Sequence, residues 1–269
     1  LVKLAENLYI LELFHGPTLA FKDFGARFMA RLMSHYLKEK GEKLSIIVAT
    51  SGDTGSAVTQ GFYGLPNIKV FVLYPSKRIT ELQEKQMATL GGNIIALEVK
   101  GSFDDCQKLA KQLLNDSELK KEINLSSANS INFGRLLPQS FYYFWSYAQL
   151  MRSNVIYCVP SGNFGNLTAS LMAKKMGLPM KQFIAATNIN DVVPQYLKTG
   201  KFVSRVSRET ISNAMDVGNP SNFARILDIY RGNYKKIAKD IVGISIGDKQ
   251  TRETIRNVHR KTKYVLDPH

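Results

Sequence analysis

The chain has 269 residues, of which 44% are hydrophobic, so it is long enough to bury one large core or two smaller ones. Its 36 basic and 22 acidic residues give a formal net charge of +14. The basic residues show no zinc-finger, RNP-type or basic-zipper pattern, which argues against a dedicated nucleic-acid-binding protein and is compatible with anionic small-molecule ligands. No apolar run approaches the roughly 18 residues of a membrane span, and no signal-peptide pattern opens the sequence.

Cysteine and histidine usage gives no sign of a metal site. Cys106 and Cys158 lie far apart in the sequence, which is typical of a reducing compartment, so we expect a cytoplasmic protein. The four histidines form no pair at ligand spacing. The sequence begins at Leu1 and ends at His269, directly after a strand-like segment at 264–266, and from this we expect a piece of a longer protein.

Near the start of the chain, Lys22 stands between Phe21 and Phe24, just after a Gly16-Pro17 turn and at the beginning of a predicted helix. Apolar surroundings disfavour the charged form of a lysine and lower its pKa, and a neutral amine is able to attack an aldehyde. Lys22 is therefore a candidate Schiff-base former. The plainer interpretation is a lysine that extends its charge past apolar neighbours, with Asp23 as the helix cap.

The rest of the chain repeats a strand–loop–helix rhythm. We predict strands at 45–49, 70–73, 94–97, 155–159 and 183–186, and helices at 53–62, 80–90, 103–114, 136–150 and up to 176. Pro138 is expected in the first turn of the 136–150 helix. Short apolar strands alternating with helices predict an α/β fold with parallel sheets covered on both faces.

Two loops join a predicted strand to a predicted helix in a way that suits an anion. The first is Thr50-Ser51-Gly52-Asp53-Thr54, where hydroxyls and backbone N–H groups converge at a helix N-terminus. Asp53 would repel an anion unless its carboxylate turns away, for instance to cap the helix. The second loop is Ser161-Gly162-Asn163-Phe164-Gly165-Asn166, which suits a phosphate monoester and matches neither a P-loop nor Gly-x-Gly-x-x-Gly.

A desolvated lysine and a phosphate-binding loop are the two features that pyridoxal 5′-phosphate (PLP) requires. Together with Ser212-Asn213-Ala214-Met215-Asp216-Val217-Gly218, these segments recur in an order that resembles the threonine synthase family. That family belongs to the fold-type II PLP enzymes, which are related to the tryptophan synthase β subunit. The resemblance covers nearly the whole chain. It implies an α/β fold with parallel or mixed sheets flanked by helices.

The resemblance also implies two domains and a set of site residues. Residues 1–45 with 140–269 would form the larger PLP-binding domain and 46–139 the smaller substrate-side domain, with the family's N-terminal domain and C-terminal end lying outside this sequence. Lys22 would bind PLP covalently and act as the acid and base. The remaining residues implied for the coenzyme are Gly162, Asn163, Phe164, Gly165, Asn166 and Asn213. Those implied for the substrate are Thr50, Ser51, Gly52, Asp53, Thr54, Lys77, Asn129, Ser130, Asn132 and Arg135.

The implied reaction converts O-phospho-L-homoserine and water to L-threonine and phosphate. We expect a small-molecule substrate, no nucleic-acid or membrane partner, and leave open whether the protein is a monomer or a homodimer. Two interpretations of Arg135 remain: its guanidinium fork could meet a phosphate, or it could form a surface ion pair.

Three alternative functions are compatible with the same residues. A serine/threonine ammonia-lyase or a cysteine synthase would use a similar lysine, although those families commonly carry asparagine shortly after it, where Asp23-Phe24-Gly25 stands here. A threonine synthase-like phospho-lyase would remove phosphate without making threonine. A non-catalytic anion-binding or nucleic-acid-binding protein would use the +14 charge alone.

Overall fold

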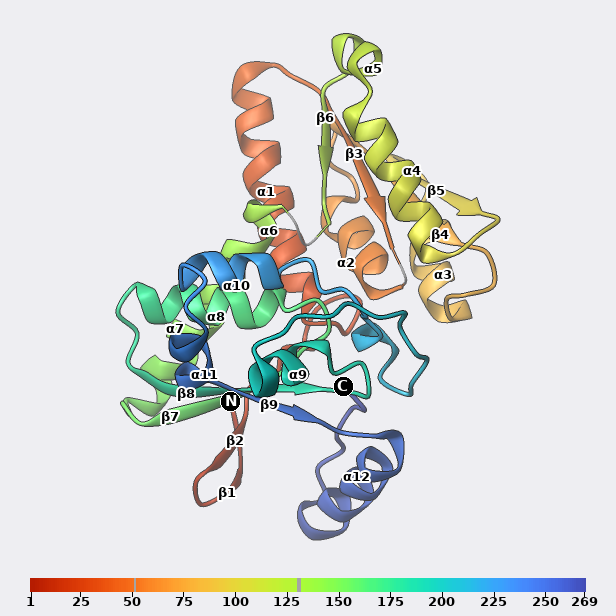
Figure 1. Cartoon of the computed structure of the whole chain (residues 1–269). Helices are drawn as coiled ribbons and strands as arrows, with labels where there is room; N and C mark the ends of the chain where they lie inside the picture. Colours follow the sequence, from red (N-terminus) through yellow and green to blue (C-terminus); the bar gives the residue numbers. More distant parts are fainter. Residues whose placement is uncertain (51, 130–131) are drawn as a thin grey trace. The chain divides into compact units, whose positions relative to one another are not determined.

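The structure is a computed structural model that describes residues 1–50, 52–129 and 132–269 (Figure 1). Its contacts divide the chain into two compact units: Leu13–Pro138, here called the lysine unit, and Leu1–Glu12 with Gln139–His269, here called the loop unit. The predicted Ser51 and Ser130 lie outside the described residues.

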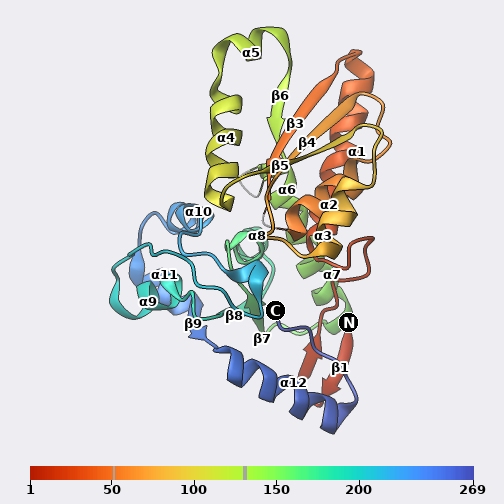
Figure 2. The same cartoon turned by 90° about the vertical axis from the view of Figure 1, so that its right-hand side faces the viewer.

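The lysine unit contains a parallel sheet in the order β5-β4-β3-β6. Its strands are β3 (Leu44–Ala49), β4 (Ile68–Pro75), β5 (Ile94–Val99) and β6 (Leu125–Ser127). Its helices are α1 (Lys22–Lys40), α2 (Asp53–Phe62), α3 (Glu81–Ala88), α4 (Phe103–Asn115), α5 (Ser117–Glu122) and α6 (Phe133–Leu136). In Figure 2, α1, α2 and α3 lie on one face of this sheet and α4 on the other.

Apolar periodicity explains both layers of the lysine unit. Met29 on α1 and Val58 on α2 are buried in one cluster with Ile46 and Val48, whose side chains leave the same face of β3. The alternate β3 residues, Ile47 and Ala49, pack with Cys106 and Ala110 of α4. Strand β3 is thus buried on both faces, as its continuous apolar sequence predicts.

The loop unit contains a second parallel sheet, in the order β7-β8-β9, and an antiparallel β1-β2 pair. Its strands are β1 (Val2–Ala5), β2 (Leu8–Ile10), β7 (Val155–Pro160), β8 (Met180–Thr187) and β9 (Ile241–Ser245). Its helices are η1 (Leu137–Ser140, which begins in the lysine unit), α7 (Phe141–Leu150), α8 (Gly165–Lys175), α9 (Val192–Thr199), η2 (Asn213–Met215), α10 (Phe223–Ile229), α11 (Tyr234–Asp240) and α12 (Asp248–Thr262).

Only one face of the β7-β8-β9 sheet is buried. Phe183 of β8 and Ile241 of β9 are buried on the face where α8, α9 and α11 pack. On the alternate positions, Ile156, Val242 and Ile244 are 45%, 42% and 36% exposed. The expectation of helices on both faces therefore holds for the β5-β4-β3-β6 sheet and does not hold for this one within the described residues.

Two predicted elements differ from the structure. The helix expected at 136–150 is divided into α6, the 3₁₀ turn η1 and α7, and Pro138 lies in η1. Proline lacks the N–H that an α-helix needs in its interior, so the helix cannot run through it unbroken. The predicted strand at 264–266 is also wrong, since in the described chain it pairs with no strand and the Tyr264 hydroxyl donates to Glu12 instead (2.7 Å).

The compact units also differ from the expected domain bounds. We expected residues 1–45 to join 140–269, whereas α1 packs along α2 and shares its core within the lysine unit. The assignment of a coenzyme role and a substrate role to separate domains stays a prediction.

Two kinds of feature are absent from the described residues. No described helix combines the length and apolar character needed to cross a membrane. The described part of the chain also contains no cluster of three or more His, Cys, Asp or Glu side chains able to hold a metal ion.

Candidate active site

Lys22 is the first residue of α1 and is fixed there by the turn that precedes it. The backbone N–H and the hydroxyl of Thr18 both donate to the carboxylate of Asp23, at 2.9 and 2.7 Å. Asp23 is therefore not the helix cap that the plainer interpretation required, since the cap position belongs to Phe21. Thr18 and Asp23 tie the turn back onto α1 and hold the Lys22 backbone in place.

The Lys22 ammonium lies in a largely buried site with one carboxylate partner. Its side chain is 16% exposed, and Nζ is 3.4 Å from Oδ2 of Asp53 and 5.9 Å from the centre of the Phe21 ring. Burial lowers the pKa of Lys22, Asp53 opposes that shift, and the nearby Arg135 adds to it. A lysine in this setting gives up its proton more readily than an exposed one, as the candidate nucleophile must.

The loop that begins at Thr50 is shaped by the Thr50 side chain itself. Its buried hydroxyl accepts hydrogen bonds from the N–H groups of Gly52 (2.9 Å) and Gly55 (2.8 Å) and donates to the carbonyl of Gly52 (3.0 Å). Gly52 has a φ of 141°, a conformation that side-chain-bearing residues rarely adopt. Thr54 follows in the first turn of α2, half-buried. Thr50 thus builds the loop, and its role as a substrate ligand stays a prediction.

Asp53 neither caps α2 nor turns away from the candidate site. Gly52 occupies the cap position, while the Asp53 carboxylate lies between the Lys22 ammonium and the amide of Gln83, whose Nε2 donates to Oδ1 at 2.7 Å. The sequence prediction missed Gln83, although the Thr80-x-x-Gln83 capping box that positions it is a recognisable pattern.

Two predicted substrate residues, Asn129 and Asn132, form hydrogen bonds with the backbone of their own unit. Asn129 pairs with the end of β3 as a strand would: its Nδ2 donates to the Ala49 carbonyl (2.7 Å) and its Oδ1 accepts from the Ala49 N–H (3.3 Å). Asn132 caps α6 through Gly134 and donates to the Ser127 carbonyl (2.8 Å). Both side chains hold the segments around the Thr50 loop, which leaves their substrate roles as predictions.

We expect Asn129→Ala to lower the free energy of unfolding by about 1–3 kcal/mol, because it leaves both backbone groups of the buried Ala49 without their amide partner. Urea denaturation measures the change. Asn115→Ala, at the exposed end of α4, is the control and should alter stability little. Equal stability of the two variants would show that the Asn129–Ala49 hydrogen bonds do not stabilise the fold.

Arg135 is buried, so the alternative of a surface ion pair is wrong. It is 4% exposed, and its Nη1 donates to the Ala128 carbonyl at 2.6 Å. Burial lowers its pKa to about 10, which still leaves the guanidinium charged near neutral pH. Lys77, by contrast, is exposed in the turn after β4, and the described interactions include no hydrogen bond or ion pair between it and this group.

The predicted phosphate loop of the loop unit runs from β7 into α8. Phe164 adopts the left-handed conformation (φ 60°) at the cap position, and within the described residues no side chain caps this N-terminus. The backbone donors of the first turn of α8 therefore face no side-chain acceptor there, and the positive end of the helix favours an anion. This is the arrangement that a phosphate group needs.

Neighbouring side chains fix the two asparagines of this loop. Oδ1 of Asn163 accepts from the N–H (2.6 Å) and hydroxyl (3.0 Å) of Ser221. Oδ1 of Asn166 accepts from the hydroxyls of Tyr142 and Tyr143, both at 2.6 Å. Burial raises the pKa of both tyrosines, so both stay protonated and donate. The Asn166 oxygen is thus occupied, which orients its Nδ2 donor.

Asn213 lies in the short turn η2, which packs against the same loop. A Cβ atom on Gly162 would lie 2.7 Å from Cα of Met215, so only glycine allows this approach. A polar cluster that the sequence prediction missed holds the turn: Asn188 and Thr210 both donate to Oδ1 of Asp216, at 2.8 and 2.7 Å. Asn188 directly follows β8, and a polar residue at the end of a predicted strand is the pattern that could have identified it from the sequence.

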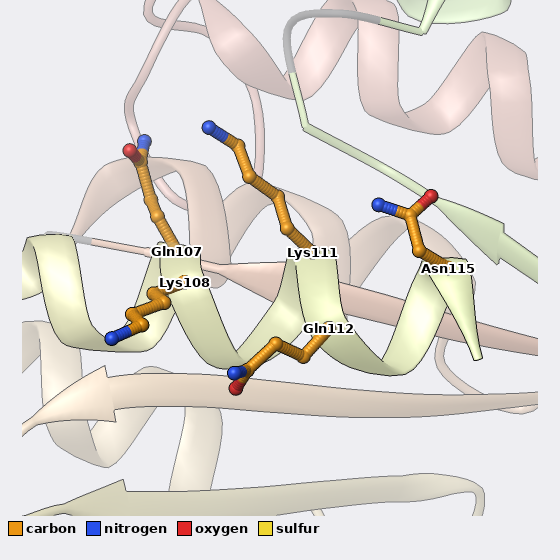
Figure 3. Close-up of a pocket in the computed structure, with 5 residues that line it drawn as sticks. All are labelled: Gln107, Lys108, Lys111, Gln112 and Asn115. Atoms are coloured by element: carbon orange, nitrogen blue, oxygen red, sulfur yellow. The ribbon is translucent and has the colours of Figure 1, made fainter.

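The structure therefore groups the predicted residues in two sets, each within one unit. Lys22, Asp53 and Arg135 lie together in the lysine unit, near the Thr50 loop and Asn129. Residues 161–166 and Asn213 lie together in the loop unit. A separate hollow of about 500 Å³ runs along α4. The described residues that line it all belong to α4, and their side chains point in different directions in Figure 3, so it is not a convergent site.

Residues 2–269 match the family model described as "Pyridoxal-phosphate dependent enzyme". The chain belongs to this PLP-dependent family. Similar proteins include the threonine synthase of Buchnera aphidicola subsp. Acyrthosiphon pisum, which is 49% identical over 271 residues. That match covers 100% of this chain and 62% of the relative, so the chain spans less than two thirds of the relative's length.

Solved structures of threonine synthases have the same fold. The Escherichia coli enzyme superposes with a TM-score of 0.90 at 48% identity, covering 100% of this chain and 62% of that one. The PLP-bound enzyme from Brucella melitensis gives a TM-score of 0.92 at 37% identity, covering 100% and 64%. These matches confirm the predicted fold class and the resemblance to the threonine synthase family.

Two features of this PLP-family chain fit the coenzyme. A buried lysine with a lowered pKa suits an aldehyde, and the N-terminus of α8, which has no side-chain cap among the described residues, suits a phosphate. Each unit therefore contains residues whose chemistry fits one part of the coenzyme, and the assignment of Lys22 and residues 161–166 to PLP stays a prediction.

Proposed function

We propose that this chain is part of a threonine synthase, which converts O-phospho-L-homoserine and water to L-threonine and phosphate in the cytoplasm. The observation that carries the proposal is the buried Lys22, whose pKa is lowered and whose Nζ lies beside one carboxylate. Similarity along the whole chain to proteins named threonine synthase supports it. The two free cysteines are compatible with the proposed location.

In this proposal the residues of the chain bind, orient and move protons. The N–H groups at the start of α8 bind the coenzyme phosphate, and Asn166 donates its Nδ2 hydrogens to the same anion. The Thr50–Thr54 loop binds the substrate carboxylate with backbone donors that the Thr50 hydroxyl holds in place. Bound PLP supplies an electron sink for the negative charge that forms at the substrate Cα.

Lys22 and Arg135 carry the proposed proton transfer and phosphate recognition. A buried amine with a lowered pKa gives up a proton at Nζ more readily than an exposed lysine does, which suits an acid–base group. Arg135 stays charged near neutral pH and would attract the γ-phosphate of the substrate. In the proposed sequence Cα and then Cβ lose a proton, the γ-phosphate leaves and takes up a proton, and Cγ gains the proton that completes its methyl group. The hydroxyl of water then adds at Cβ as the other water proton is released, and Cα regains a proton.

Product analysis of the full-length protein tests the proposal. Incubation with O-phospho-L-homoserine is expected to release phosphate and threonine in a one-to-one ratio, as measured by a phosphate assay and amino-acid chromatography. Phosphate with a keto acid would point to a lyase instead. A protein that contains PLP and releases neither product would contradict the proposed substrate while leaving the family assignment intact.

A further inference from the structure

Gln83 connects the beginning of α3 to the carboxylate that faces Lys22. Its Oε1 accepts from the Thr80 N–H (3.1 Å), and its own N–H donates to the Thr80 hydroxyl (3.2 Å), which together form a capping box. Its Nε2 donates to Oδ1 of Asp53 at 2.7 Å. Both ends of the Gln83 amide are thus engaged, and the capping bond on Oε1 determines that the donor faces Asp53.

The Gln83 amide also lies close to the backbone of residue 52. A Cβ atom on Gly52 would lie 2.5 Å from Cδ of Gln83, so the amide packs directly against the Gly52 backbone. The space is available only because residue 52 is glycine. The Gln83 amide therefore contacts Thr80, Asp53 and the Gly52 backbone, and these contacts support the carboxylate from α3.

The charged groups around Lys22 oppose one another. Asp53 on α2 favours the ammonium form, Arg135 on α6 disfavours it, and burial disfavours it most. Asp23, the next residue on α1, is already bonded to Thr18. Asp53 therefore supplies the attraction that favours the charged form of Lys22. A small displacement of its Oδ2 away from Nζ weakens that attraction and makes the neutral form of Lys22 more favourable.

We propose that Gln83 is a positioning residue that holds Oδ1 of Asp53, keeps Oδ2 against Nζ of Lys22, and thereby sets the pH at which Lys22 becomes neutral and captures the coenzyme. This inference rests on the proposed role of Lys22. In the capture step the neutral amine condenses with the coenzyme aldehyde and one water molecule leaves, so protonated Lys22 must first lose its proton. Gln83 acts on the amine through Asp53, since the described interactions include no hydrogen bond between Gln83 and Nζ of Lys22.

The experiment follows capture of PLP by the coenzyme-free, full-length protein as a function of pH, using visible absorbance and borohydride reduction of the adduct. Gln83→Met keeps the side-chain length and removes both the donor and the acceptor. We expect the midpoint of its capture profile to fall by about half a pH unit, so that capture well below the midpoint is roughly three-fold faster. Asp53→Asn removes the negative charge altogether and should shift the midpoint further, by about one unit.

One further variant separates positioning from helix capping. Thr80→Ala removes the hydroxyl half of the capping box but keeps the N–H that holds Oε1 of Gln83, so its midpoint should match wild type.

Two results would overturn the inference: an unshifted midpoint for Gln83→Met, or an equal downward shift for Thr80→Ala. Each would reduce Gln83 to a helix cap. The proposed function is tested separately by Lys22→Ala, because a reducible adduct in that variant would remove the role of Lys22 itself. Normal capture by Lys22 with an unshifted Gln83→Met profile would reject only the inference.

Discussion

Lys22→Ala is expected to abolish covalent capture of PLP and to lower the proposed turnover by about 10³-fold or more. The amine that condenses with the aldehyde and the acid–base group are the same atom in this proposal, so one substitution removes both contributions. Borohydride reduction followed by peptide mass analysis measures the adduct, and phosphate release measures turnover.

Lys38→Ala is the matched control, because Lys38 lies exposed on the same helix. It should retain both the adduct and the turnover. A Lys22→Ala protein that keeps its thermal stability and still yields a reducible adduct would place the reactive lysine elsewhere.

Gly162→Ala is expected to weaken PLP binding at least ten-fold and to destabilise the fold by about 1–3 kcal/mol. The added Cβ would lie 2.7 Å from Cα of Met215 and 3.1 Å from the Ala214 carbonyl oxygen, both backbone atoms that cannot turn away as a side chain would. Either η2 or the phosphate loop must move. A PLP titration followed by absorbance and a thermal melt measure the two effects.

Gly247→Ala provides the control for that substitution. A Cβ at Gly247 would make only an ordinary contact, 3.9 Å from Ile189, and its φ of −87° suits alanine. PLP affinity and melting temperature should therefore stay close to wild type. Unchanged PLP affinity in Gly162→Ala would show that the close approach of η2 does not shape the phosphate loop.

The sequence predicted the structure best where a hydrophobic pattern is compatible with one kind of secondary structure. The apolar run at 45–49 and the glycine-containing turn after it predicted β3 and α2, since a buried strand followed by a polar loop and an amphipathic segment has few other folds. Pro138 shows the limit of that reasoning. Proline is tolerated in the first turn of a helix and also marks the end of one, and the aromatic periodicity at 141–150 does not distinguish these cases.

The candidate site was only partly predictable, for a different reason. Lys22 stood out because its neighbours in the sequence are also its surroundings, in particular Phe21. Asp53 was identified without its partner, because the ion pair with Lys22 joins residues 31 positions apart. Asn129 and Asn132 have the side chains of ligands, yet their amides close hydrogen bonds within the fold. An asparagine amide makes the same hydrogen bonds to a ligand as to the backbone. Only the folded structure shows which of the two it contacts.

The direction of α1 has a consequence for Lys22 that no neighbouring side chain controls. The helix is 19 residues long and Lys22 is its first residue, so the lysine lies at the end where the aligned peptide dipoles leave a partial positive charge of about half a unit. An ammonium is unfavourable there. Part of the weakened basicity of Lys22 is thus built into the peptide backbone, and it persists whichever residues stand at positions 53, 83 and 135. A lysine placed at the opposite end of the same helix would be made more basic by the same dipoles.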